Sequence, residues 1–143
     1  MQVVPLLESH LEELQPQEAQ AFIGNFLANE DYRAQLCFMP HSYAGVLDGR
    51  VIGIAGVAMI YPHIGTAWAI LSNDSQKNML RLTRAIKGFL DSFDCKRIET
   101  HVKHDFTEGH RWAEMLGFKN ETPDGMNNYG IDGETYDLYA RCK

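Results

Sequence analysis

The clearest pattern along this chain is a long stretch in which apolar side chains return every third or fourth position. Between residues 75 and 93 the apolar positions are Met79, Leu82, Ile86, Phe89, Leu90 and Phe93, and the basic residues Lys77, Arg81, Arg84 and Lys87 fall between them. This period is that of an amphipathic helix with one buried and one wet side. The pattern predicts a helix from Ser75 to about Phe93.

A second pattern alternates with a period of two and predicts strands. In residues 97–103, Ile98, Thr100 and Val102 alternate with charged or polar residues, as in a strand with one buried face. The run "TAWAILS", residues 66–72, is short and apolar and precedes turn residues, which predicts a central strand covered on both faces. Asp48-Gly49 stands between two further β-rich runs and predicts a tight hairpin turn.

The two ends of the chain complete the predicted order of elements. Residues 2–7 predict a short strand, and residues 8–15 and 16–36 predict two helices, the second with Pro16 in its first turn and with helical spacing of Ala19, Phe22, Ile23, Phe26 and Leu27. Residues 107–118 predict a helix that ends at Gly117, and a strand is expected over residues 135–142. The predicted order is strand, two helices, three strands, helix, strand, helix and two strands, an α/β (α+β) fold in a single domain over residues 1–143.

Composition and charge narrow the class of protein. The chain has 143 residues, of which 45% are hydrophobic and 22% are charged, as is ordinary for a globular domain. No apolar run approaches the roughly 20 residues of a membrane span, and the first residues lack a basic flank, so we expect a protein without a secretory signal that resides in the cytosol. The net charge of -6 argues against nucleic acid as a partner.

The element order, together with "HRWAEMLGFKNE" at residues 110–121, resembles the GNAT superfamily of N-acyltransferases. In that family a helix ends at Leu-Gly-Phe and the chain then turns into a penultimate strand. The resemblance implies a mixed, twisted sheet of about six to seven strands with helices on both faces. More narrowly, "AWAILS" before a basic helix and the late "YGIDGETYDLYAR" resemble small GNAT-like proteins encoded by tailed phages, which the internal virion protein A of short-tailed phages also resembles.

The resemblance implies that acetyl-CoA would bind where the apolar run of residues 66–72 leads into the basic helix. Family members place glycines there, because backbone N–H groups must approach a pyrophosphate closely, but residues 72–78 contain none. The residues implied as cofactor contacts are Ile70, Leu71, Ser75, Gln76, Lys77, Asn78 and Arg81. Asp74 would have to point away from the phosphates. The alternative is a helix start without a ligand, capped by Asn73 or Ser75 with Gln76 completing a capping box.

Transfer of an acyl group to an amine needs a base and an acid. Glu99 and His101 share a predicted strand face and are the candidate bases. The resemblance implies a tyrosine acid four residues before Gly117, but Ala113 stands there, so Tyr136, or Tyr129 or Tyr139, would have to act instead. His101 and His104, with Asp105 beside them, could suggest a metal, but their spacing of three is wrong for one strand face and no third ligand is evident, so we expect no metal site.

Two functions follow as expectations. The first is an acyl-CoA-dependent N-acyltransferase of phage type that moves an acetyl group from a coenzyme A thioester to an amine of a small molecule or host protein. The second is a non-catalytic phage protein that uses a degenerate form of the fold for assembly in the virion or for binding a host factor. The sequence leaves a homo-oligomer open in both cases, and packaging in a virion in the second.

Overall fold

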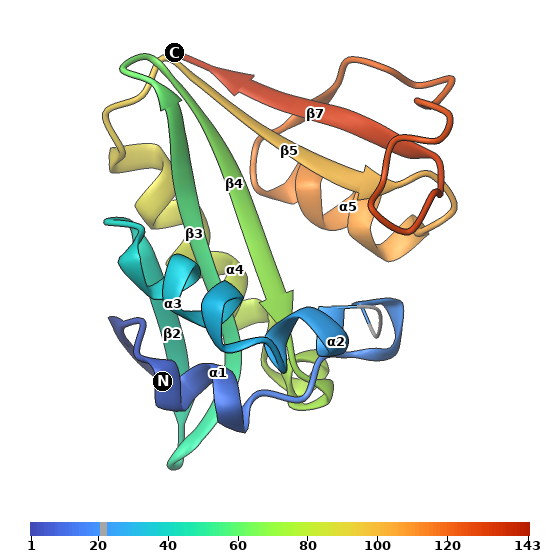
Figure 1. Ribbon diagram of the computed structural model, residues 1–143. Helices are drawn as coiled ribbons and strands as arrows, with labels where there is room; N and C mark the ends of the chain where they lie inside the picture. Colours follow the sequence, from blue (N-terminus) through green and yellow to red (C-terminus); the bar gives the residue numbers. More distant parts are fainter. Residues whose placement is uncertain (21–22) are drawn as a thin grey trace. The chain divides into compact units, whose positions relative to one another are not determined.

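The computed structural model describes residues 1–20 and 23–143, and their strands form one mixed sheet (Figure 1). The elements are β1 Gln2–Pro5, α1 Glu8–Glu13, α2 Ile23–Leu27, α3 Glu30–Phe38, β2 Ser42–Leu47, β3 Arg50–Tyr61, β4 Ile64–Leu71, α4 Met79–Ser92, β5 Arg97–Lys103, α5 Thr107–Met115, β6 Lys119–Asn120 and β7 Tyr136–Cys142, with short 3-10 helices η1 Glu18–Gln20 and η2 Asn73–Asn78. The seven strands lie in the order β1-β2-β3-β4-β5-β7-β6. The predicted mixed sheet with helices is confirmed, and the apolar run of residues 66–72 does supply its central strand.

The chain divides into two compact units. The first contains residues 1–58 and 68–82, and the second contains residues 59–67 and 83–143. Strands β3 and β4 and helix α4 contribute residues to both.

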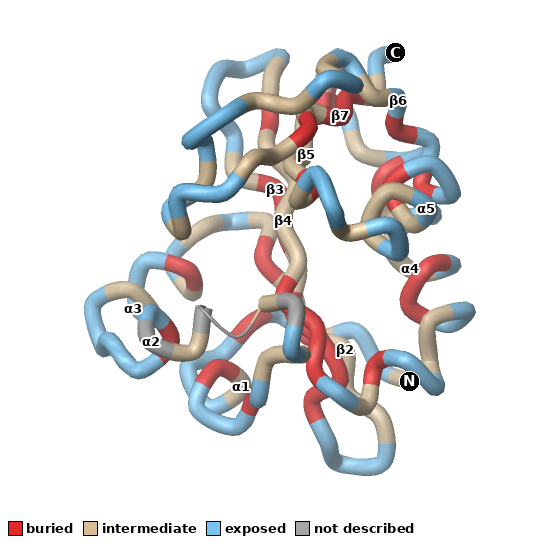
Figure 2. The backbone as a smooth tube through the Cα atoms, turned by 90° about the vertical axis from the view of Figure 1, so that its right-hand side faces the viewer, coloured by how far each residue is buried: buried red, intermediate tan, exposed pale blue. Residues whose placement is uncertain are grey.

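In the first unit β1, β2 and β3 pair in antiparallel fashion. Asp48 and Gly49 both have positive φ, 52° and 76°, and Leu47 pairs directly with Arg50, so the predicted tight hairpin turn is confirmed. Leu11, Leu14 and the other buried side chains of the helical segments pack with those of the strands into one core, which consists of Leu6, Leu11, Leu14, Leu27, Leu36, Ala44, Val51, Ile54 and Ile70. Buried residues are most continuous along β3, whereas β2 has buried residues only in its first half. Figure 2 shows exposed residues in pale blue over much of α1 and α3.

Two glycines shape the strands of this unit where Leu82, in the first turn of α4, approaches. A Cβ atom at Gly45 would lie 3.6 Å from Leu82 Cδ2, and one at Gly53 would lie 3.0 Å from Leu71 Cδ2. These small residues make room for Leu71 and Leu82, which are both buried. The start of α4 is thereby fixed against the strands of the first unit.

The predicted second helix, residues 16–36, is wrong as a single element. It consists of η1, α2 and α3, because the Asn29 side chain accepts a hydrogen bond from the Tyr32 N–H at 3.1 Å and so begins a new helix. Pro16 does not lie in a helical turn but forms a bridge with Ser72. The predicted helical position Phe22 lies outside the described residues.

In the second unit β5 runs parallel to the first residues of β4, at Ile64–Thr66, and antiparallel to β7, which also pairs with β6. Helix α5 is followed by Gly117 with φ +93°, so the predicted left-handed glycine is confirmed. The buried apolar side chains of this unit include Leu90, Ile98, Val102, Ala113, Leu116, Phe118 and Tyr139. No helix among the described residues is both long enough and apolar enough to cross a membrane.

Gly56 offers a stability test of the first unit. A Cβ atom there would lie 2.4 Å from the His41 carbonyl oxygen and 3.0 Å from the Trp68 ring, so we expect Gly56→Ala to lower the free energy of unfolding by about 1–3 kcal/mol. Gly88 is the matched control, because it is exposed within α4 with no atom within 4 Å of an added Cβ, and Gly88→Ala should raise stability by about 0.5–1 kcal/mol. Urea denaturation measures both, and equal effects of the two changes would contradict the packing described at Gly56.

Candidate functional site

The junction between β4 and α4 is held by the neighbouring strand β3. The Ser72 N–H and the Ser72 hydroxyl both donate to the Ile52 carbonyl oxygen, each at 3.1 Å. Helix η2 follows, and the Ser75 N–H bonds to the Ser72 carbonyl at 3.1 Å. The N–H groups of Asn73 and Asp74 precede this bond, and among the described residues they have no hydrogen-bond partner. The junction therefore presents backbone N–H groups at the positive end of a helix.

The side chains at this helix start differ from the predicted cap. Ser72, rather than Asn73 or Ser75, precedes η2, and its side chain makes no capping bond. The Ser75 side chain is fully buried, and its hydroxyl lacks a hydrogen-bond partner in the part of the chain that the structure describes. The predicted capping box is therefore wrong.

Asp74 is paired with a cation from the β2–β3 hairpin. Its Oδ2 atom lies 2.6 Å from an Nη atom of Arg50, the first residue of β3. A free carboxylate at this helix start would repel a phosphate. The guanidinium offsets that charge, so the acidic residue that argued against a phosphate site is neutralised by its neighbour.

The predicted cofactor residues fall into two groups. Gln76, Lys77 and Arg81 are exposed, and no ion pair or hydrogen bond within the described residues engages the two cations. Asn78 is half-buried and donates through its side chain to the Asp74 carbonyl at 3.1 Å. Ile70, Leu71 and Ser75 are buried. Any side-chain contact with a ligand would therefore come from the exposed group, and contact with the buried group would be through backbone.

The backbone of Leu71 is already occupied by the segment before α2. The Leu71 N–H donates to Gln20 Oε1 at 3.0 Å, and the Leu71 carbonyl accepts the Gln17 N–H at 2.8 Å. The Gln20 amide also donates to the Ala69 carbonyl at 2.8 Å. A ligand that used the Leu71 backbone would have to displace these contacts.

In the second unit Glu99 belongs to an ion-pair cluster. Its Oε2 atom accepts from Arg97 Nε at 2.9 Å, and Arg97 also binds Glu121. These hydrogen bonds raise the pKa of Arg97, and the bond to Arg97 lowers the pKa of Glu121. The Glu99 carboxylate is therefore already engaged by the Arg97 guanidinium.

His101, the second predicted base, is paired with Tyr129, which lies in the loop between β6 and β7. The His101 Nε2 atom lies 2.9 Å from the Tyr129 hydroxyl, and the two ring centroids are 5.0 Å apart. Burial lowers the pKa of His101, while the charge of Glu99 acts in the opposite direction. The ring is therefore kept neutral at physiological pH, which is the form that can accept a proton.

Tyr136, the predicted acid, donates its hydroxyl to Asp132 Oδ2 at 3.1 Å. Burial and this carboxylate raise the pKa of Tyr136 to about 12. Proton transfer is most efficient when the pKa of the acid lies near the working pH. Its proton is thus held tightly, and Tyr136 is a weak general acid in this arrangement.

A hydrogen-bonded network that was not predicted from the sequence joins the turn after β5 to α5, β6 and β7. His104 Nδ1 lies 2.7 Å from Asp137 Oδ1, Asn120 donates to Asp137 Oδ2 at 2.8 Å, and His110 Nδ1 lies 2.7 Å from the Tyr139 hydroxyl. Asp137 is 2% exposed. Asp137 and Tyr139 are two positions apart in a predicted strand, so the sequence predicts that they share one face of it. The pairing of Asp137 with His104 depends on tertiary contacts and cannot be predicted in this way. In the described residues no three His, Cys, Asp or Glu side chains converge as metal ligands.

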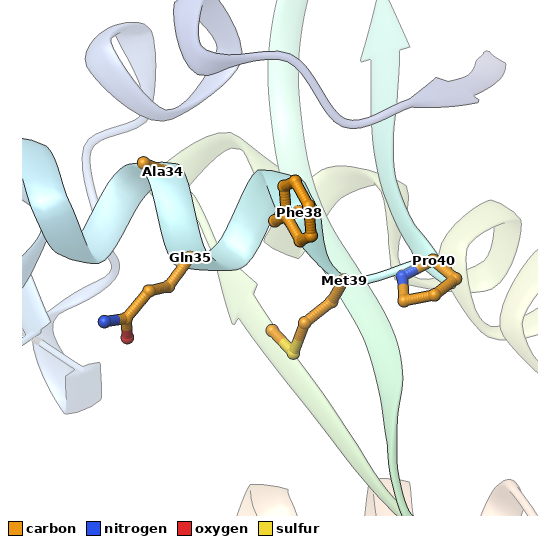
Figure 3. Close-up of a pocket in the computed structure, with 5 residues that line it drawn as sticks. All are labelled: Ala34, Gln35, Phe38, Met39 and Pro40. Carbon is orange, nitrogen blue, oxygen red and sulfur yellow. The ribbon is translucent and has the colours of Figure 1, made fainter.

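A separate pocket lies at the end of α3 in the first unit (Figure 3). Its lining consists of Ala34, Gln35, Phe38, Met39 and Pro40. None of these side chains can act as an acid or base or neutralise a phosphate. This pocket is therefore not the candidate site.

The lowered pKa of His101 predicts a pH dependence of stability. The unfolded chain takes up a proton on this residue near its ordinary value of about 6.5, and the folded protein does so at lower pH. The free energy of unfolding should therefore fall as the pH drops below about 7, and His101→Gln should flatten that slope. Glu99→Gln should steepen the slope, because Glu99 raises the pKa of His101. Urea denaturation at several pH values measures this, and an unchanged slope in His101→Gln would contradict it.

Comparisons with known proteins fit this architecture at the level of fold. No protein-family model and no curated protein matches the sequence. Among solved structures, an acetyltransferase of the GNAT family from Bacillus anthracis has a TM-score of 0.70 at 12% identity, covering 98% of this chain and 93% of that one. The ribosomal-protein-S18-alanine N-acetyltransferase from Escherichia coli has a TM-score of 0.73 at 16% identity, with 99% and 92% covered.

A further similar structure is a chimera of spermidine N-acetyltransferase from Vibrio cholerae and hSSAT, with a TM-score of 0.71 at 16% identity over 99% of this chain and 94% of that one. The names of the last two proteins specify different amines, a ribosomal-protein alanine and spermidine, and each of the three structures resembles this chain over nearly its whole length. At such low identity the likeness concerns the fold. The chain has the fold of the GNAT acetyltransferases.

Proposed function

We propose that this protein is an acyl-CoA-dependent N-acyltransferase that transfers an acetyl group from acetyl-CoA to an amine. The observation that carries the proposal is the start of η2, where the N–H groups of Asn73 and Asp74 have no partner within the described part of the chain and lie beside a carboxylate paired with Arg50. The shared fold supports it, because the similar structures are acetyltransferases. Acetyl-CoA is a thioester and would supply the activated acetyl carbon.

The nucleotide end of the cofactor is assigned to the first unit. Backbone N–H groups and the positive end of a helix favour a pyrophosphate. Lys77 and Arg81 are exposed cations without partners among the described residues, so they can neutralise phosphate charge at little cost. Gln76 adds an exposed amide donor.

The chemical step is assigned to the second unit. The amine nitrogen attacks the thioester carbonyl carbon, the new N–C bond forms, and the C–S bond breaks with release of coenzyme A. His101 is the proposed proton acceptor, because burial keeps its ring neutral and Tyr129 fixes its orientation. Glu99 and Tyr136 remain predictions, and their bonds to Arg97 and Asp132 weigh against them.

The acceptor is proposed only as a class, an amine on a small molecule or a protein. Both kinds occur among the similar structures, whose names specify spermidine and a ribosomal-protein alanine. The narrower resemblance to phage proteins rests on sequence stretches alone and stays a prediction, as does residence in the cytosol or a virion.

Charge reversal at the helix start tests cofactor binding. We expect coenzyme A to bind with micromolar affinity in calorimetry, and Lys77→Glu to weaken binding by about tenfold, which corresponds to roughly 1.4 kcal/mol. Lys87→Glu is the charge-matched control, because Lys87 lies in the part of α4 that belongs to the second unit and is paired with Asp91.

Equal weakening by both changes would show that overall charge, rather than this helix start, governs binding. The absence of binding at millimolar coenzyme A would overturn the proposal. That result would instead fit a protein that uses the fold without catalysis.

A change at Gln20 is expected to tighten coenzyme A binding rather than weaken it. If the cofactor uses the Leu71 N–H, it must displace Gln20 Oε1, so Gln20→Ala should tighten coenzyme A binding by roughly threefold, an effect of about 0.7 kcal/mol. Glu18→Ala, an exposed change in the same 3-10 turn, is the control and should leave affinity unchanged. Weaker binding in Gln20→Ala would show that Leu71 is not a cofactor contact.

A further inference from the structure

His104, at the end of β5, is held by four separate contacts in the second unit. Its ring Nδ1 atom lies 2.7 Å from Asp137 Oδ1. Its backbone N–H donates to the Thr135 carbonyl at 2.9 Å, and its carbonyl accepts from His110 Nε2 at 2.8 Å. Gly125 packs against the ring, since a Cβ atom there would lie 3.2 Å from Nδ1. The position and tilt of this imidazole are therefore fixed.

The partner of Nδ1 determines which ring nitrogen carries the proton. An ionised carboxylate can only accept hydrogen bonds, so the neutral His104 ring must bear its proton on Nδ1. Asp137 is almost fully buried and its other oxygen is bound by Asn120. Nε2 is left as an unprotonated nitrogen without a hydrogen-bond partner among the described residues, on a side chain that is 47% exposed.

Two neighbouring histidines that also form side-chain hydrogen bonds, His101 and His110, lack that arrangement. His110 uses both nitrogens, because Nε2 donates to a carbonyl and Nδ1 lies against the Tyr139 hydroxyl. His101 has a hydroxyl partner, which can donate or accept and therefore does not fix the tautomer. His110 Nδ1 also lies 3.8 Å from Asp137 Oδ2, which is beyond hydrogen-bond distance. Of these three, His104 is the one with a buried carboxylate hydrogen-bonded to one nitrogen and an open second nitrogen. This is the geometry by which a carboxylate orients a general-base histidine.

We propose that His104, oriented by Asp137, is a catalytic general base whose Nε2 takes a proton from the attacking nucleophile. The inference rests on the proposed function for the identity of that nucleophile, an amine. Protonation at Nε2 produces an imidazolium whose Nδ1–H faces Asp137, so the new charge is stabilised where it forms.

The proton balance of the reaction shows why a second base is needed. A protonated amine carries three N–H protons and the amide product carries one, so two protons leave the nitrogen. One proton ends on the sulfur of the departing coenzyme A, and the other is released to water. His104 is the proposed acceptor of the first proton, which its half-exposed ring passes to bulk solvent before the amine attacks. His101 is the proposed acceptor of the second proton, which ends on the sulfur.

The tautomer of His104 can be measured on the unmodified protein. Nitrogen-15 NMR of the neutral side chain is expected to show a protonated Nδ1 and a bare Nε2 for His104. Asp137→Asn should invert this pattern, because the Asn amide can donate to Nδ1 and drive the proton to Nε2. A protonated Nε2 in the neutral ring of the unmodified protein would overturn the proposal.

Diethyl pyrocarbonate tests the reactivity of the same atom without any acyl-CoA. A bare Nε2 attacks its carbonyl carbon, forming an N–C bond as ethyl carbonate leaves, and mass spectrometry locates the modified residue. We expect His104 to react and Asp137→Asn to slow it about tenfold or more. Asn120→Ala is the control, because it removes the other donor to Asp137 and leaves the His104 tautomer unchanged. Equal rates in the protein and Asp137→Asn would contradict the proposal.

Measurements of kcat and of coenzyme A affinity then distinguish a failure of this proposal from a failure of the proposed function. His104→Ala should lower kcat for amine acetylation at least tenfold, leave coenzyme A affinity unchanged, and recover activity when imidazole is added to the solution. A purely structural His104 would show no such rescue, and that result would overturn the catalytic role. A protein that fails to bind coenzyme A at all refutes the proposed function, whereas the NMR and modification results still decide whether the dyad exists.

Discussion

The organisation of the candidate site depends on how the backbone of β4 is hydrogen-bonded along its length. Its first residues pair with β5 at Ile64, Gly65 and Thr66. Farther along, the polar groups of Ala69 and Leu71 find partners in Gln17 and Gln20, and Ser72 is held by the Ile52 carbonyl. Because buried backbone groups must be paired, these contacts fix where the strand ends and where the helix begins. Every proposed contact with a cofactor is placed by that end point.

The charge balance at the helix start explains how a phosphate site can exist without glycines. Glycine is useful there because it lets backbone N–H groups approach a ligand. In this chain the more serious obstacle is the negative charge of Asp74, and Arg50 removes it through an ion pair. Lys77 and Arg81 then leave the helix start with net positive charge. The side-chain cations therefore add to what the backbone N–H groups of this helix start can offer a phosphate.

Local sequence signals predicted much of the fold, because they depend on neighbouring residues. The Asp48-Gly49 turn, the glycine after α5 and the central position of β4 all follow from local pattern. The break of the predicted second helix at Asn29 was missed, since a capping residue inside an apolar period is a weak signal. The pairs Arg50–Asp74 and His104–Asp137 could not be predicted, because their members lie far apart in the chain and meet only through strand pairing. Their chemistry was visible in the sequence, but their proximity was not.

A crystal structure of the protein with coenzyme A tests the central claim most directly. The account predicts the pyrophosphate on the N–H groups of Asn73 and Asp74, with the Asp74 carboxylate still bound to Arg50 and the Lys77 side chain near a phosphate oxygen. A cofactor bound elsewhere, or an Asp74 side chain that fills the space over the helix start, would contradict it.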